Sequence, residues 1–305
     1  MQHQASGAPA DSARRGLGYG IAAYLLWGLF PIYLKALGAL APGEILAHRI
    51  CWSLLLLGAM IFVAGRSRQL RAALGNRKVV LTLLATSLLI AVNWLVYIHA
   101  VVSGRLLAGS LGYYLNPLVS VLLGVVILKE KLSRGQAGAL LLALAGIAVL
   151  AANAGGGLWI SLTLAASFSL YGLLRKMAPV DPLTGLAIET AILAPLAVGY
   201  LLWRAGQGQS GFGVNGTTDL LLLFSGAVTA IPLLLFSAAA KRLRYSTVGI
   251  LQFIAPSLQF LLAVFAFGEV LTRAHMICFA AIWAAVAIYA AEGLRISRTA
   301  DAPGA

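Results

Sequence analysis

Long apolar runs separated by short polar gaps dominate the chain. Ten of these runs have about twenty residues each, the length a helix needs to cross the hydrocarbon core of a bilayer. They cover residues 17–37, 44–65, 79–101, 106–128, 134–152, 158–176, 182–203, 219–240, 245–267 and 272–293. Apolar and polar residues do not alternate within the runs, so helices fit them and the strands of a β-barrel do not. The pattern predicts an all-α membrane protein with ten transmembrane helices.

The gaps between the runs are too short to hold a soluble domain. We expect residues 1–16, which are small and polar, to form a disordered tail, and residues 294–305 to form a second tail. Two arginines precede the first run, as in a signal peptide, but no small-residue cleavage site interrupts that run, so we interpret it as the first helix. The Gly-rich gap at 204–218 matches the spacing of a dinucleotide-binding fingerprint. No strand precedes it, and we interpret it as a flexible linker.

Composition and charge narrow the class further. The 305 residues are 61% hydrophobic and 10% charged, whereas soluble domains have about 45–50% and about 25%. Soluble enzymes and secreted disulfide scaffolds are therefore disfavoured, and Cys51 and Cys278 lie within apolar runs as small hydrophobes. Of the 22 basic residues, 17 lie in alternate gaps and tails. The positive-inside rule then places both termini in the cytoplasm, and the net charge of +13 does not indicate a nucleic-acid partner.

The two halves of the chain share a weak internal repeat. A shift of 139 residues aligns, without a gap, Pro117 with Pro256, Leu122 with Leu261, Leu123 with Leu262, Val125 with Val264, Glu130 with Glu269, Leu132 with Leu271, and Arg134 with Arg273. Each half holds five runs, an odd number, so the second half enters the membrane in the opposite sense. Inverted repeats of this kind are typical of secondary transporters, whose sites lie near the midplane between the repeats.

The residues around the repeat resemble a known family. The segments that begin at Pro117 and Pro256 and end in Lys129-Glu130-Lys131 and Gly268-Glu269-Val270 resemble two copies of the EamA-type domain of the drug/metabolite transporter superfamily. Within that superfamily, residues 23–35, 44–53, 93–101, 110–124, 170–176 and 251–269 resemble the RarD-type permeases.

The resemblance implies a fold and a function. It implies a bacterial inner-membrane permease built from two inverted five-helix EamA-type repeats, residues 17–152 and 158–293. The partners are then membrane lipid and a small organic solute, with no cofactor, and chloramphenicol is linked to the family by name. Several superfamily members couple transport to protons. An intramembrane enzyme would need paired catalytic or metal-ligand groups that the sequence does not show, whereas a non-transporting scaffold or receptor stays an alternative.

Two prolines lie at the midpoints of their runs. Pro117 and Pro256 are each the twelfth residue of a 23-residue run, and a proline at that depth frees a backbone carbonyl that lipid cannot satisfy. They predict paired kinks around a central cavity, or packing kinks that neighbouring helices satisfy.

Polar and aromatic residues near these kinks are candidates for solute binding. Polar side chains at this depth usually face the protein interior, where they bind solute or join helices by hydrogen bonds. The candidate residues are Tyr24, Trp27, Asn93, Trp94, Tyr97, Tyr113, Asn116, Gln252 and Gln259. For the aromatic ones, an interfacial belt is the competing interpretation.

Four ionisable residues are candidates for proton coupling or gating. Glu44, His48 and Arg49 open the second run near the outer surface, as a gate, a proton relay or an interfacial ion pair. Glu189 lies about 10 Å into the seventh run and is the first candidate for proton coupling, unless it is the static partner of a cation such as Arg49.

The repeated glutamates Glu130 and Glu269 lie just outside the membrane runs. Each comes three residues before a hydroxyl residue, Ser133 or Thr272, that we expect to cap the next helix. Because the two glutamates fall on opposite sides of the membrane, a shared structural role is favoured. No metal-ligand spacing occurs in the sequence.

Overall fold

Helices form every regular element in the residues that the computed structural model describes, which are 7–128, 133–153, 157–240, 242 and 251–300. They are α1 (Gly7–Ala36), α2 (Pro42–Val63), α3 (Ser67–Leu74), α4 (Arg77–Val102), α5 (Leu106–Leu128), α6 (Arg134–Asn153), α7 (Leu158–Met177), α8 (Pro182–Gly206), α9 (Gly216–Ala240), α11 (Ile254–Leu261), the π-helical turn η1 (Leu262–Ala266) and α12 (Arg273–Ala300). Within this described part, six helices are long and apolar enough to cross a membrane, and three shorter helical segments are also apolar. The all-helical membrane class is confirmed. The ninth predicted run, 245–267, lies partly outside the described residues, so the count of ten stays a prediction.

Two helical segments differ from the sequence prediction. α1 begins at Gly7 rather than at residue 17, so residues 7–16 are helical and not a disordered tail. This segment is rich in Ala and Arg, which are strong helix formers, and Pro9 lies in the first turn, where no N–H is needed. The short helix α3 was not predicted. It has no buried residue, so no apolar run marks it in the sequence.

At the second predicted kink the described chain forms a turn that precedes α11. The chain forms a turn at Gln252 and Phe253, and α11 starts at Ile254. Pro256 therefore lies in the first turn of α11, where its missing N–H leaves no hydrogen bond unmade. By contrast, α5 runs through position 117 without interruption, and the side chain of Pro117 lies outside the described residues.

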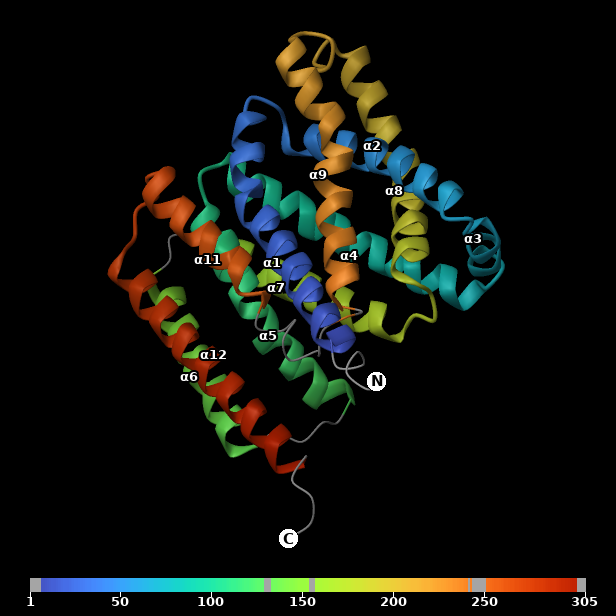
Figure 1. Ribbon diagram of the computed structural model, residues 1–305. Helices are drawn as coiled ribbons and strands as arrows, with labels where there is room; N and C mark the ends of the chain where they lie inside the picture. The colour runs from blue at the N-terminus through green and yellow to red at the C-terminus, as the bar shows by residue number, and fades with distance from the viewer. Residues whose placement is uncertain (1–6, 129–132, 154–156, 241, 243–250, 301–305) are drawn as a thin grey trace, which may run out of the picture.

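The packing of the helices pairs the two halves of the chain. The 139-residue shift exchanges α1 with α7, α2 with α8, α4 with α9, α5 with α11 and α6 with α12. Under this exchange the packed pair α1–α9 becomes α7–α4, α5–α7 becomes α11–α1, and α2–α9 becomes α8–α4, and all six pairs are in contact. The pairs α2–α8, α5–α11 and α6–α12 map onto themselves and are also in contact. Figure 1 shows α6 and α12 side by side at one edge of the molecule.

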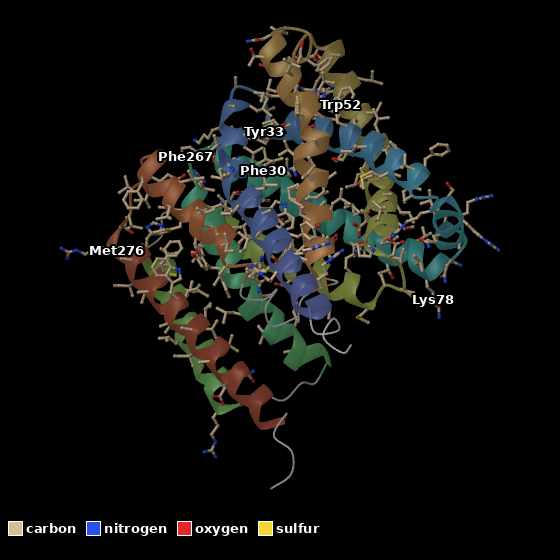
Figure 2. The ribbon with its side chains drawn as sticks, in the orientation of Figure 1. Phe30, Tyr33, Trp52, Lys78, Phe267 and Met276 are labelled. Atoms are coloured by element: carbon tan, nitrogen blue, oxygen red, sulfur yellow. The ribbon has the colours of Figure 1, made fainter. Side chains whose placement is uncertain are left out.

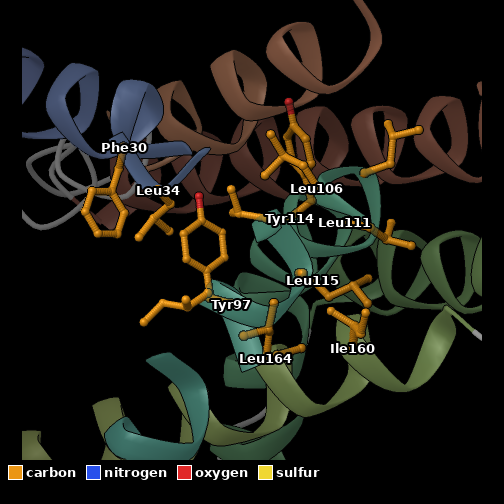
Figure 3. Packing of buried hydrophobic residues seen from close by; sticks show 14 of the residues in the cluster. Phe30, Leu34, Tyr97, Leu106, Leu111, Tyr114, Leu115, Ile160 and Leu164 are labelled. Carbon is orange, nitrogen blue, oxygen red and sulfur yellow. The ribbon is translucent and has the colours of Figure 1, made fainter. Parts of the chain in front are cut away.

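The largest buried cluster draws side chains from α1, α2, α4, α5, α6, α7, α8, α9, η1 and α12. Its side chains are mainly Leu, Ile, Ala and aromatic residues, and Figure 3 shows Phe30 and Leu34 of α1 beside Tyr97 of α4. Many large apolar side chains outside it are exposed, among them Phe62, Leu141 and Phe265. An apolar exterior around a packed interior is what a protein in lipid requires.

Small residues allow the helices to approach closely. A Cβ at Gly112 of α5 would lie 2.8 Å from the Cβ of Leu164 on α7, and one at Gly226 of α9 would lie 2.7 Å from the carbonyl oxygen of Trp52 on α2. Helices in membranes depend on such contacts, because lipid offers no hydrophobic driving force for their association.

Side chains cap several helix ends, as the sequence predicts for Ser133 and Thr272. The backbone N–H of Gln136 donates to Ser133 Oγ at 3.2 Å, and the backbone N–H of Ser133 donates to Gln136 Oε1 at 3.0 Å. These two bonds form a capping box on α6. The His275 amide donates to Thr272 Oγ1 at 3.3 Å at the start of α12. Asp181 caps α8 by accepting from the Leu183 amide at 3.1 Å.

The repeated glutamate Glu269 joins two separate parts of the fold. Its carboxylate accepts from the Leu106 amide at 2.6 Å and the Leu107 amide at 2.8 Å, at the N-terminus of α5. Burial raises the pKa of Glu269, and this effect outweighs the two backbone N–H groups and the charge of Lys35. A structural role for this residue is therefore supported, but by capping a helix of the first half rather than its own neighbour. Glu130 lies outside the described residues.

Candidate functional site

The central candidate is the guanidinium of Arg49, which is buried between helices of both halves. Arg49 is on α2 and is 5% exposed. Its Nε donates to Thr229 Oγ1 of α9 at 3.3 Å. Its Cζ lies 4.7 Å from the ring centre of Phe30 on α1 and 5.0 Å from that of Trp94 on α4. Aromatic faces attract a cation, so α1, α2, α4 and α9 jointly hold this charge in the interior.

A run of aromatic rings leads away from Arg49. Phe30 stacks on Tyr33 and on Tyr97, with 5.6 Å and 6.2 Å between the ring centres. The ring centre of Tyr97 lies 5.2 Å from that of Tyr113 on α5. Figure 2 shows Phe30 and Tyr33 on the same stretch of α1. Tyr97 is 3% exposed, and its hydroxyl has no hydrogen-bond partner among the described residues.

Asn93 joins three helices next to these rings. Its Nδ2 donates to the Leu164 carbonyl at 3.1 Å and to Ser167 Oγ at 3.0 Å, both on α7. Its Oδ1 accepts from the Tyr113 hydroxyl at 3.2 Å. The structure therefore brings together five of the predicted binding or gating residues, namely Arg49, Asn93, Trp94, Tyr97 and Tyr113. Within this group, the bonds of Asn93 favour the interhelical alternative.

A second group of predicted residues lies between α1, α9 and α11. Trp27 contacts the rings of Tyr24 at 5.4 Å and Phe236 at 5.8 Å. Gln259 is 2% exposed, donates to the Trp27 carbonyl at 3.2 Å, and leaves its Oε1 without a partner among the described residues. Beside this group is an apolar groove of about 380 Å³, which Leu25 and Leu258 help to line.

The remaining predicted binding residues lie on α5 and before α11. Asn116 is 8% exposed, and its Oδ1 has no partner in the described part of the chain. Its backbone carbonyl accepts from Ser169 Oγ at 3.1 Å. Gln252 is half-buried in the turn before α11.

Glu189 lies in a separate buried cluster. The carboxylate is 1% exposed and accepts from Thr86 Oγ1 of α4 at 2.6 Å and from the Tyr171 hydroxyl of α7 at 3.3 Å. Its ionic partner is Arg175 of α7, with Nη1 3.6 Å from Oε1. Arg49, considered from the sequence as its cation, is held elsewhere by Thr229 and the aromatic rings.

Glu44 and His48 form a cluster with the loop between α8 and α9. Glu44 is fully buried and accepts from Arg204 Nη2 at 3.1 Å and from the Gly211 amide at 2.6 Å. The His48 ring lies 5.3 Å from the ring of Phe212. The gap that the sequence suggested was only a linker therefore makes specific contacts with α2.

Sequence reasoning missed several members of these clusters. Arg175 and Arg204 were counted only as topology charges, yet each neutralises a buried glutamate. Thr86, Tyr171 and Thr229 were not considered. Their depth in apolar runs was a signal, because a hydroxyl there needs a partner. No cluster of three or more metal-ligating side chains occurs among the described residues.

Comparisons with known proteins place the chain among membrane transporters. Residues 14–152 match the EamA-like transporter family. The chain is 44% identical to Protein RarD of Streptomyces exfoliatus, with 96% of this chain and 93% of that protein covered. It is 43% identical to an uncharacterized transporter of Vibrio cholerae, covering 95% and 96%. It is 32% identical to the chloramphenicol-sensitive protein RarD of Pseudomonas aeruginosa, covering 93% and 96%. A solved crystal structure at 24% identity superposes with a TM-score of 0.60 over 90% of this chain and 96% of that one.

Proposed function

Because the chain belongs to the EamA family of transporters, and within it to the RarD-type permeases, we propose that it moves a small organic solute by alternating access. The protein is an integral membrane transporter. The finer proposal is that two inverted repeats of five helices, residues 17–152 and 158–293, rock against each other around the cluster at Arg49.

The helix contacts carry this proposal. Three packed pairs and their counterparts 139 residues away are all in contact, and three further pairs map onto themselves, which is the pattern that two inverted repeats related by a pseudo-two-fold axis produce. The pair α2–α8 maps onto itself, so it lies on that axis. Arg49 on α2 and Glu189 on α8 are each the eighth residue of their helix, one position apart under the 139-residue shift, so each repeat carries a buried charge in the same turn of its second helix.

Contacts at the two ends of the α2–α8 pair supply candidate gates. At the outer end, Glu44 of α2 binds Arg204 and the Gly211 amide. At the cytoplasmic end, Arg66 after α2 binds Asp181 before α8, with Nη1 2.6 Å from Oδ1. Alternating access requires that one end opens while the other is closed, so these contacts break in turn.

Glu189 is the proposed proton carrier. Protonation removes the negative charge that holds Arg175. The hydroxyls of Thr86 and Tyr171 then face a neutral carboxyl group instead of a carboxylate. The pair joins α7 to α8 and, through Thr86, to α4. A proton at this carboxyl therefore loosens contacts within the second repeat and between the repeats.

The proposal is tested with purified protein in liposomes. Uptake of labelled chloramphenicol and of a metabolite panel is measured with and without a pH gradient. We expect gradient-dependent flux that Glu189→Gln, Glu44→Gln and His48→Ala lower, and that Arg273→Gln, a change at an exposed residue of α12, leaves unchanged. Flux unaffected by the first three changes would remove the coupling and gating roles. Equal flux without a gradient would indicate a facilitator.

Alternation itself has an independent test. Cys51 and Cys278 are first replaced by Ser, because both are free thiols, and Thr229→Cys then places one thiol beside Arg49. A membrane-impermeant thiol reagent should reach it from either side, at rates that a transported solute changes in opposite directions. Phe265→Cys, at a position 79% exposed on the outer face of η1, is the matched control. A thiol at 229 that reacts from one side only would refute alternating access.

A further inference from the structure

Arg49 differs from the other buried charges of the described residues in its partners. Glu44 is paired with Arg204, and Glu189 with Arg175. Arg49 has no carboxylate within ion-pair distance in the described part of the chain, although it is only 5% exposed. A buried charge in a membrane protein is costly unless something compensates it. A buried cation without an acidic partner among the described residues points to a partner from outside the chain.

The geometry around the guanidinium leaves one edge for such a partner. Nε is used by Thr229, and Phe30 and Trp94 lie against the group. Buried Nη1 has no hydrogen-bond partner among the described residues. The π faces fix the position of the cation but offer no acceptor for its N–H groups.

A second donor without a partner lies on the neighbouring ring. The hydroxyl of Tyr97 is buried and unpaired in the described residues, and its ring stacks on Phe30, the ring that also holds Arg49. A guanidinium and a hydroxyl together favour a ligand with several acceptor oxygens and a negative charge.

We propose that Arg49 binds the carboxylate of the transported solute, which is a small organic monoanion, with Tyr97 as the second donor. The inference rests on the permease function above and names its substrate class. A planar guanidinium matches a carboxylate in a bidentate manner, and a single negative charge neutralises the one unpaired cation. A phosphate dianion would bring excess charge that no second unpaired cation of this cluster balances. Phe30 and Trp94 supply apolar surface for the rest of the solute.

The test compares carboxylates with their neutral amides. Benzoate and indole-3-acetate are titrated into the protein in nanodiscs by calorimetry, beside benzamide and indole-3-acetamide. We expect the carboxylates to bind and the amides to bind at least tenfold more weakly. Arg49→Gln should weaken carboxylate binding by about 30-fold or more, as expected when one partner of a buried charge pair is removed. Arg49→Lys should retain part of the affinity, and Arg273→Gln all of it.

Several results would overturn the inference. These are equal binding of acids and amides, unchanged carboxylate affinity in Arg49→Gln, or no binding of either carboxylate by the unaltered protein. If Arg49→Gln does not fold, two arms keep the test open. One is Arg49→Lys, and the other is the comparison of acids with amides, which uses the unaltered protein. Flux of a neutral solute without carboxylate binding would refute the inference and leave the permease function standing. Carboxylate binding without flux of any solute would refute the permease function and leave the binding of a carboxylate at Arg49 standing.

Discussion

Removing the charge of Arg175 should destabilise the protein more than removing the charge of Glu189, although the two residues form one ion pair. The reason is their unequal burial, since the side chain of Arg175 is 15% exposed and that of Glu189 is 1% exposed. Arg175→Gln leaves a carboxylate without a cation in the interior. Glu189→Gln leaves a guanidinium that reaches water and keeps its hydrogen bond to the Pro182 carbonyl at 3.3 Å.

The magnitudes follow from the distances. At the observed separation of 3.6 Å, the gross Coulomb attraction is about 4–5 kcal/mol for an effective dielectric constant of about 20. An uncompensated buried carboxylate costs about 3–5 kcal/mol, so Arg175→Gln should lower the free energy of unfolding by roughly that amount. In Glu189→Gln the amide oxygen still accepts from Thr86, so we expect a loss of about 1–2 kcal/mol.

Equilibrium unfolding in mixed detergent micelles measures both losses, and the double variant completes a mutant cycle. We expect the coupling energy to be about 2–3 kcal/mol, because the partly exposed arginine is screened. The coupling should change little with salt, since buried pairs are poorly screened. Arg68→Gln, on the exposed surface of α3, is the control. A loss in Arg175→Gln no larger than in the control, or smaller than in Glu189→Gln, would refute the assignment of a buried pair.

Three further changes test the helix ends and the loop between α8 and α9. Glu269→Gln should cost about 1–2 kcal/mol in thermal unfolding. Because burial raises the folded pKa of Glu269, its contribution is complete below the unfolded pKa of about 4.3 and falls as pH rises through the folded pKa, so the loss should be larger at pH 4 than at pH 7.5. Burial acts to raise the pKa of Asp181, but its hydrogen bonds and Arg66 lower it overall. Its contribution to stability is therefore present above about pH 3.9 and lost as pH falls through the folded pKa. Asp181→Asn should therefore make the melting temperature depend less steeply on pH in this acid range. Gly211→Ala places a Cβ against Leu40 and should speed protease cleavage of residues 207–215, whereas Gly206→Ala, which has open space, should not. Equal cleavage of both variants would contradict the contact.

The apolar pattern was sufficient to predict where the long apolar helices of the described residues lie, but not the exposed helix α3 or the start of α1. Lipid cannot satisfy backbone hydrogen bonds, so every apolar run of membrane length must be helical, and α2, α4 and α8 lie close to their predicted limits. The small hydroxyl residues Ser133 and Thr272 were sufficient to predict two helix starts, because a cap is a local interaction between residues close in sequence. The family resemblance also came from the sequence, and the relatives confirm it.

The partners of the buried charges were decided by the tertiary structure. Arg175 and Glu189 are 14 residues apart on two helices, and Arg204 meets Glu44 across 160 positions. Charge type and depth alone leave several cations available for each acid, and only the packing of α2 against α8 and of α7 against α4 selects among them. The turn before α11 was missed for a related reason, since a proline in an apolar run is compatible with a kink in a helix or with the first turn of a new one.

The sequence by itself determined that the chain enters lipid as helices and that a cation lies within the second run at Arg49, and it predicted that the two halves are related. The tertiary structure decided that this cation meets aromatic rings and a hydroxyl instead of an acid. Transfer into lipid depends on each residue's own hydration, which sequence records directly. A compensating contact depends on which helices approach each other, and that is set by the packing of all of them together.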